Sequence, residues 1–201
     1  MINNQKTILE EISFSGVGLH TGVNCSIKIK PALENSGIIF IRKDVDNSKE
    51  IKAIVENVID CNRGTTIGCD GLKIHTVEHL LSALYGLQID NAHIEIDNIE
   101  PPILDGSSMP FIKKILETGI KEQNCKKDYI QILEPIEYID ESSNIHIKVS
   151  PLDRFSITYN ADFSNEGIGK QSFTLNSLND YKEKVGTART FCTIDELEYS
   201  R

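Results

Sequence analysis

The chain has 201 residues, of which 39% are hydrophobic and 25% charged, with 13 Gly and 6 Pro. That length suits one or two folded domains, and the composition excludes collagen-like and disordered proteins. The formal net charge of −9 makes nucleic acid a poor partner, because binding to a phosphate backbone needs a positively charged surface.

The sequence predicts a cytoplasmic protein without a transmembrane segment. No apolar run reaches the roughly 18 residues that span a bilayer, and the first residues lack the apolar core of a signal peptide. The five cysteines are widely spaced and contain no C-x-x-C pair, which indicates free thiols in a reducing compartment.

Alternating apolar residues predict strands in the first half of the chain. Residues 23–30 have an apolar side chain at every odd position, as in a strand with one solvent-facing side, and Pro31 is expected to end that strand. Residues 38–41 and 92–97 predict two more strands.

Two helices are predicted in the same half. The first covers about residues 76–85, where apolar side chains form one stripe, and Gly86 is expected to end it. The second begins near Ser108 and Pro110 and ends at Gly119.

A polar, basic connection at residues 121–128 interrupts this pattern, and strands are predicted again at 130–133 and 145–149. We therefore expect one domain over residues 1–127 and a second over 128–201. Residues 147–151 match residues 27–31 at an offset of 120, which suggests a duplication. The second copy is then expected to be cut short, and the final residues, 193–201, have the pattern of an unfinished helix.

The densest group of chemically active side chains is His75-Thr76-Val77-Glu78-His79. A neutral imidazole can bind Zn²⁺, and an adjacent carboxylate can take a proton from metal-bound water. Read as H-x-x-E-H, the segment is an inverted zincin motif with His75 and His79 as ligands and Glu78 as the base. A surface helix that carries two histidines by chance is an equal alternative.

The other candidate segments carry weaker signals. Three glycines around His20 indicate a tight turn or a close approach of the backbone to another group. Phosphate-loop and dinucleotide-binding patterns are absent. The Asp-Gly turn at residues 103–108 needs no function, and His93 and His146 fall on the solvent side of their predicted strands.

Five segments, taken together in order and spacing, resemble the UDP-3-O-acyl-N-acetylglucosamine deacetylases, the zinc amidases of lipid A synthesis in Gram-negative bacteria. The matching segments are GVGLHTG at 16–22, RGTT at 63–66, TVEHLLSAL at 76–84, ILDGS at 103–107 and ARTF at 188–191. The resemblance covers the whole chain.

The resemblance implies an α+β fold of two similar domains, each a β-sheet layered against helices, with the metal site between them and the second domain incomplete. It implies that His79 is a Zn²⁺ ligand, that Glu78 is the general base, and that Thr190 and Phe191 lie near the reacting amide of the substrate. The family position matching His75 is variable and is not a ligand, which disfavours the zincin interpretation. The loop around Arg63 is expected to border the site.

The family's remaining ligands, in a His-x-x-x-Asp motif, and its histidine general acid have no counterpart in these 201 residues. The resemblance therefore implies a fragment or a truncated product. For the complete enzyme it implies hydrolysis of the acetamide of a UDP-linked acylated amino sugar, and contact with its acyl chain or a membrane surface. Two alternatives stay open: a non-catalytic remnant that binds a partner, and an H-x-x-E-H zinc protease.

Overall fold

The computed structural model describes residues 3–46, 49–163 and 167–192. This part of the chain is a mixed α and β protein with several β-sheets and three α-helices. It forms two compact units, unit 1 of residues 3–126 with 182–192 and unit 2 of residues 127–181. Residues 193–201, for which the sequence predicts an unfinished helix, lie outside the described residues.

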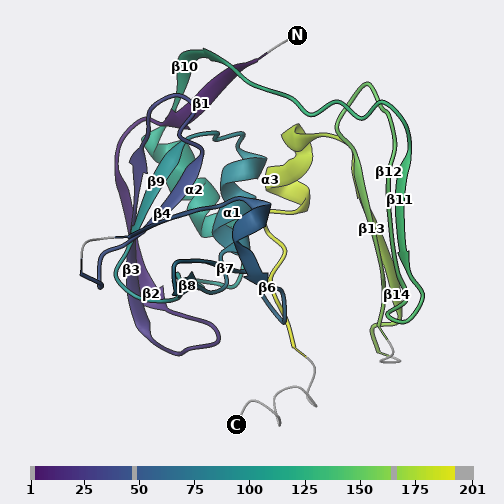
Figure 1. The fold of residues 1–201 in the computed structure, drawn as a ribbon, viewed down its shortest axis with the longest axis horizontal. Coiled ribbons are helices and arrows are strands. Elements are labelled where there is room, and N and C mark those ends of the chain that lie inside the picture. Colours follow the sequence, from purple (N-terminus) through teal and green to yellow (C-terminus); the bar gives the residue numbers. More distant parts are fainter. Residues whose placement is uncertain (1–2, 47–48, 164–166, 193–201) are drawn as a thin grey trace. The chain divides into compact units, whose positions relative to one another are not determined.

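Unit 1 is built on a five-stranded sheet in the order β2-β3-β9-β4-β5 (Figure 1). The strands are β2 (Ile12–Val17), β3 (Asn24–Pro31), β9 (Ala92–Ile96), β4 (Ile38–Arg42) and β5 (Lys49–Lys52). All neighbours are antiparallel except β4 and β9. The sequence-predicted strands at 23–30, 38–41 and 92–97 are confirmed.

Helices α1 (Glu78–Gly86) and α2 (Met109–Thr118) lie side by side on one face of this sheet (Figure 1). Both bury an apolar stripe, with Leu80 and Leu84 in α1 and Phe111 and Ile115 in α2 at most 1% exposed. The burial of these side chains, and of the inward residues of β3 and β9, forms the core of unit 1.

Smaller sheets complete unit 1. Strand β1 (Asn4–Ile8) pairs with β10 (Ile120–Lys126), and β6 (Val58–Asp60), β7 (Thr66–Cys69) and β8 (Leu72–Ile74) form a three-stranded sheet after the 3₁₀ turn η1 (Val55–Asn57). The prediction of a loop at residues 121–128 was therefore wrong. Those residues form an edge strand whose Gln123 side chain is buried and bonds the amide of Asn91 and the carbonyl of Ala32.

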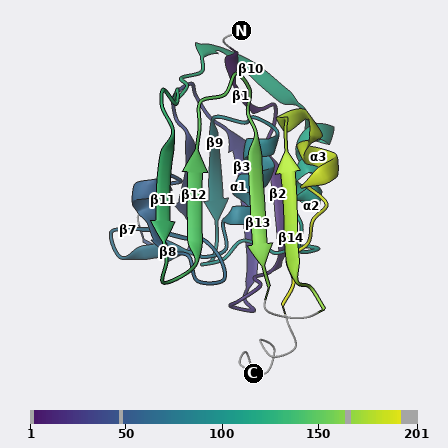
Figure 2. The same cartoon turned by 90° about the vertical axis from the view of Figure 1, so that its right-hand side faces the viewer.

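Unit 2 consists of two hairpins, seen edge to edge in Figure 2. One joins β11 (Ile136–Asp140) to β12 (Ile145–Val149), and the other joins β13 (Ile157–Asp162) to β14 (Lys170–Leu175). The 3₁₀ turn η2 (Leu178–Asp180) and helix α3 (Tyr181–Lys184) follow. The strand predicted at 145–149 is confirmed, but residues 130–133 form no strand, and β11 begins six residues later than expected.

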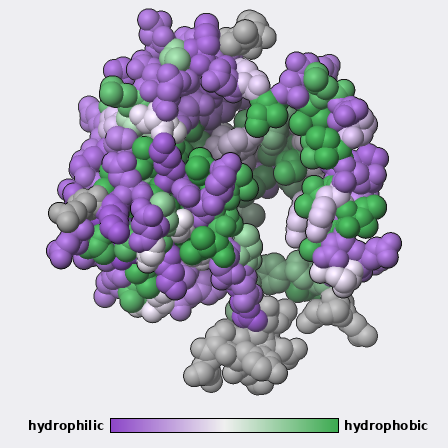
Figure 3. All heavy atoms as spheres, in the orientation of Figure 1, coloured by the Kyte–Doolittle hydropathy of each residue, from purple (hydrophilic) through white to green (hydrophobic). Residues whose placement is uncertain are grey.

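Unit 2, like the main sheet of unit 1, contains two antiparallel hairpins. In unit 1, hairpins β2–β3 and β4–β5 lie on either side of β9. No strand among the described residues of unit 2 pairs with β12 and β13 in that way. Each hairpin also exposes apolar side chains, among them Ile147 at 55% and Ile157 at 55%, and Figure 3 shows hydrophobic residues, in green, at the surface of this part of the chain. The predicted duplication and the division at residue 127 stay predictions. Residues 182–192, assigned by sequence to the second domain, are grouped with unit 1.

The cysteines of this fold differ in accessibility, which gives a testable prediction. All five are free, and Cys61, Cys69 and Cys192 are exposed. Cys25 is 3% exposed, and its burial, together with the neighbouring Asp97 carboxylate, raises the pKa of its thiol to about 12. Because the thiolate is the reactive form, a disulfide reagent at pH 8 is expected to modify the exposed thiols at least about 100-fold faster than Cys25. One uniform rate for all five thiols would contradict this packing.

Candidate functional site

The Glu78–His79 pair stands at the start of α1, as the sequence predicts, although the helix begins two residues later than expected. Thr76 has a φ of +52°, a left-handed conformation that is unusual for a β-branched residue and that separates α1 from the preceding chain. Glu78 Oε1 lies 3.8 Å from His79 Nε2. Both side chains are partly exposed, so an imidazole and a carboxylate face solvent together.

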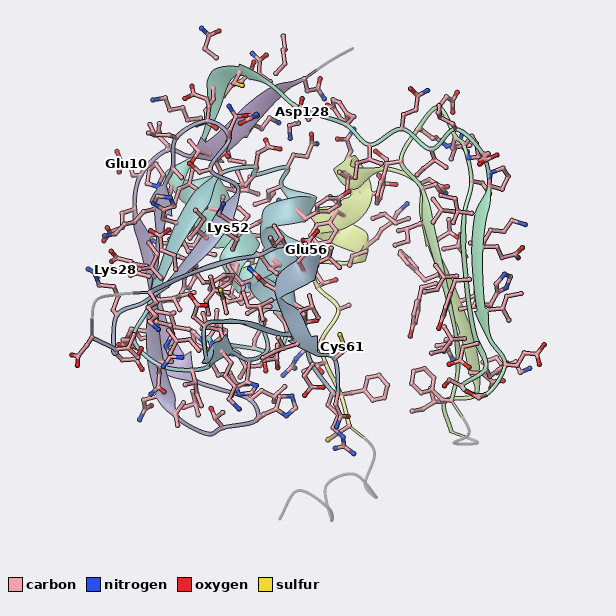
Figure 4. The ribbon with its side chains drawn as sticks, in the orientation of Figure 1. Glu10, Lys28, Lys52, Glu56, Cys61 and Asp128 are labelled. Carbon is pink, nitrogen blue, oxygen red and sulfur yellow. The ribbon has the colours of Figure 1, made fainter. Side chains whose placement is uncertain are left out.

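A loop after β6 holds Glu78 in place. Cys61, labelled in Figure 4, opens this loop, which continues through Arg63 and Gly64. The backbone N–H of Thr65 donates to Glu78 Oε2 over 2.8 Å, and the N–H of Val77 donates to the carbonyl of Thr65 over 3.2 Å. One carboxylate oxygen of Glu78 is therefore engaged by the backbone, and Oε1 faces the side of His79.

The same loop brings in His20, to which the sequence assigns no definite role. His20 Nε2 lies 3.1 Å from the carbonyl oxygen of Arg63. A Cβ atom built on Gly64 would lie 3.4 Å from Glu78 Oε1, 3.6 Å from Thr76 Oγ1 and 3.7 Å from His20 Nε2. Polar atoms from two separate segments, the start of α1 and the His20 loop, thus lie within van der Waals distance of one side of Gly64. The glycine-rich sequence around His20 was the only signal that pointed to it.

Glu100 joins the His20 loop to the start of α1. Its side chain is fully buried and accepts hydrogen bonds from the N–H groups of His20 and Thr21 and from the hydroxyls of Thr21 and Thr76. Burial raises the pKa of this carboxyl, but the hydrogen bonds outweigh burial and hold the pKa below its usual value. Glu100 is not predictable as a site residue from the sequence, because an isolated glutamate carries no motif.

The Asp-Gly turn at 103–108 connects Thr190 to His79. The N–H of Thr190 donates to the carbonyl of Gly106 over 2.9 Å, and Ser108 Oγ donates to the carbonyl of His79 over 2.9 Å. Burial raises the pKa of Asp105, but hydrogen bonds from Ser107 outweigh it and lower the pKa overall. The turn expected to be merely structural therefore links two predicted site segments.

The two predicted substrate-binding residues lie at the surface of unit 1. Thr190 is held through its backbone to Gly106, and the neighbouring Arg189 Nε donates to the carbonyl of Asp105 over 2.7 Å. Phe191 is 60% exposed. Their role in substrate binding stays a prediction.

His75 lies close enough to Glu100 and His20 for their charges to act on its pKa, but it is not on α1 with Glu78 and His79. It precedes the left-handed Thr76 and lies off α1, where its Nδ1 is 3.0 Å from Thr66 Oγ1. Burial, and then the nearby Lys73, lower the pKa of His75. The inverted zincin motif needs both histidines on one helix face, so this geometry argues against it.

The described residues include side chains of the kinds that a catalytic zinc site uses. His79 is a suitable ligand and Glu78 a suitable base, but catalytic Zn²⁺ is usually held by three protein ligands. Within residues 3–46, 49–163 and 167–192, no group of three or more His, Cys, Asp or Glu side chains is placed to hold a metal ion. These residues therefore do not form a complete zinc site by themselves.

Comparison with known proteins decides the family. The family model described as UDP-3-O-acyl N-acetylglycosamine deacetylase matches residues 5–201. The chain belongs to this deacetylase family.

No helix in the described part of the chain is both long and apolar enough to cross a membrane.

Individual relatives agree with this assignment. The chain is 45% identical over 199 residues to the bifunctional enzyme LpxC/FabZ of Chlorobaculum tepidum, covering 98% of this chain and 43% of that protein. It is 40% identical over 198 residues to the UDP-3-O-acyl-N-acetylglucosamine deacetylase of Wolinella succinogenes, covering 98% of this chain and 65% of the relative. The chain thus spans less than two thirds of the length of these relatives.

Proposed function

We propose that this chain carries the general base and one zinc ligand of a UDP-3-O-acyl-N-acetylglucosamine deacetylase of lipid A biosynthesis. The observation that carries the proposal is the Glu78–His79 pair at the start of α1, with Glu78 fixed by the N–H of Thr65. Membership in the deacetylase family supports it.

The proposed reaction is hydrolysis of the acetamide on the amino sugar. A water oxygen adds to the acetamide carbonyl, the carbon–nitrogen bond breaks, and acetate and the free amine result. Zn²⁺, when bound, supplies the Lewis acid that polarises the carbonyl and lowers the pKa of the water.

Each residue of the pair has a separate role in this proposal. Glu78 takes the proton of the attacking water on Oε1, since Oε2 already accepts the N–H of Thr65. His79 ligates the metal through its imidazole. The family's further ligands, and the acid that protonates the leaving nitrogen, have no counterpart in these 201 residues, so the proposal assigns no residue to them.

Thr190 and Phe191 are proposed to border the amide of the substrate. The Asp105–Ser108 turn supports this placement, because it bonds the backbone of Thr190 at one end and the backbone of His79 at the other. The proposal includes a UDP-linked acylated amino sugar as the substrate, which rests on the family resemblance. It also includes a cytoplasmic location, which rests on the apolar runs and the cysteine pattern of the sequence.

Zinc binding by the 201-residue chain tests the ligand assignment. Because a single imidazole cannot hold catalytic Zn²⁺, equilibrium dialysis is expected to show weak binding without a fixed stoichiometry. A tight one-to-one complex that survives His79→Ala would show that the metal site lies elsewhere.

A further inference from the structure

Glu100 is a buried carboxylate that is held by uncharged hydrogen-bond donors. Its side chain is 0% exposed, and its compensation comes from neutral donors. Oε1 accepts from the His20 N–H (3.0 Å) and the Thr76 hydroxyl (2.6 Å), and Oε2 accepts from the Thr21 N–H (2.8 Å) and hydroxyl (2.6 Å). A buried charge is costly unless it is fully hydrogen-bonded, so this arrangement fixes its partners tightly.

The chain around Glu100 is shaped to reach it. A Cβ atom on Gly18 would overlap Glu100 Oε2 and would lie 2.8 Å from Thr21 Oγ1. Glycine at this position lets the backbone of the His20 loop wrap around the carboxylate. The close approach that the glycine-rich segment predicts is therefore an approach to Glu100.

The hydrogen bonds of the Glu100 carboxylate connect it to two residues of the site, Glu78 through Thr76 and His20 through its backbone. On one side, Oε1 holds the hydroxyl of Thr76, whose left-handed backbone precedes Glu78 by two residues. On the other, both oxygens hold the N–H of His20, whose ring lies against the Arg63 carbonyl. An unfavourable backbone conformation such as that of Thr76 persists only when surrounding contacts over-determine it.

We propose that Glu100 is a positioning residue that sets the direction of the Glu78 carboxylate and of the His20 imidazole beside Gly64. It touches neither group's reacting atoms, and acts through Thr76 and through the His20 backbone. The proposal rests on the proposed function, in which Glu78 is the base. It extends that function by naming what holds the base in place.

The carboxylate form is required for this role. Each oxygen of Glu100 accepts from a backbone N–H, which cannot itself accept, so an amide at this position would turn its NH₂ group towards an N–H. Glu100→Gln keeps the shape and loses an acceptor. Thr76→Val removes only the hydroxyl on the α1 side, and Thr76→Ser restores it.

The test uses ¹⁵N-labelled 201-residue chain and measures the amide of Thr65, which donates to Glu78 rather than to Glu100. In Glu100→Gln we expect a changed Thr65 proton shift and hydrogen exchange at least about tenfold faster, with changed ring signals of His20. Thr76→Val is expected to change the proton shift and the exchange rate of the Thr65 amide in the same direction. Thr76→Ser is expected to match the wild type in both. Glu95→Gln, the same substitution on the solvent face of β9, is the matched control and should leave Thr65 unchanged.

The proposal fails if folded Glu100→Gln keeps the wild-type Thr65 and His20 signals while only its stability falls, because Glu100 then has a merely structural role. If Glu100→Gln does not fold, the comparison of Thr76→Val with Thr76→Ser tests the proposal instead. An unchanged Thr65 amide signal in Thr76→Val then overturns the proposal. This readout needs neither metal nor substrate. Failure of the deacetylase function is therefore seen separately, in the absence of acetate release.

Discussion

Glu78→Gln is expected to reduce the rate of acetate release by about 10²–10⁴-fold, the usual cost of losing a general base, while zinc stays bound. The suitable protein is a chimera in which this chain replaces the 199 matching residues of the Chlorobaculum tepidum relative. The substituted amide side chain would keep the shape of Glu78 and could still accept the N–H of Thr65, but it cannot take a proton. The measurements are kcat and the zinc content per chain.

Two control variants separate the roles of the pair. His79→Ala is expected to lose both zinc and activity, because it removes a ligand. His75→Ala is expected to stay near wild type in both, because His75 lies off α1 and bonds Thr66. Full activity of Glu78→Gln across neutral pH would show that another group takes the proton.

Phe111→Ala is expected to lower the free energy of unfolding by about 3–5 kcal/mol, the range for large aromatic side chains in a core. Phe111 is 1% exposed and packs edge-to-face on Phe14, with ring centroids 4.9 Å apart. Leu116→Ala on the same helix is the matched control. Leu116 is 42% exposed, so its loss should cost much less. Urea unfolding followed by circular dichroism measures both variants, and a loss below about 1 kcal/mol for Phe111→Ala would contradict the packing.

Strands and helices with one buried face could be predicted from the sequence. In β3 the odd positions Cys25, Ile27 and Ile29 are at most 3% exposed and Lys28 faces solvent, so alternation reports the structure directly. Strand β10 was missed because its residues are mostly polar. Its stability comes from backbone pairing with β1 and from the buried amide of Gln123, and neither leaves a hydrophobic period.

The start of α1 could not be predicted from periodicity. Apolar spacing continues back to Val77, but Thr76 takes a left-handed backbone and bonds Glu100, a residue 24 positions away. That one turn moves His75 off the helix. The same turn argues against the zincin interpretation, which assumed that the helix includes His75.

The reactive side chains of the site could be predicted from the sequence more easily than the residues that hold them in place. Adjacent Glu78 and His79 carry a pattern of known chemical use, and the glycines around His20 indicate a close backbone approach. Glu100 and the Asp105–Ser108 turn act through contacts between distant segments, which a single sequence does not display.

The most direct test of the central proposal is acetate release from UDP-3-O-acyl-N-acetylglucosamine by the zinc-loaded chimera. The proposal predicts release at a rate that His79→Ala abolishes and Glu78→Gln reduces by at least about 100-fold. A folded, zinc-loaded chimera that releases no acetate, or one whose rate is unaffected by either substitution, would contradict the assignment of the base and ligand to this pair.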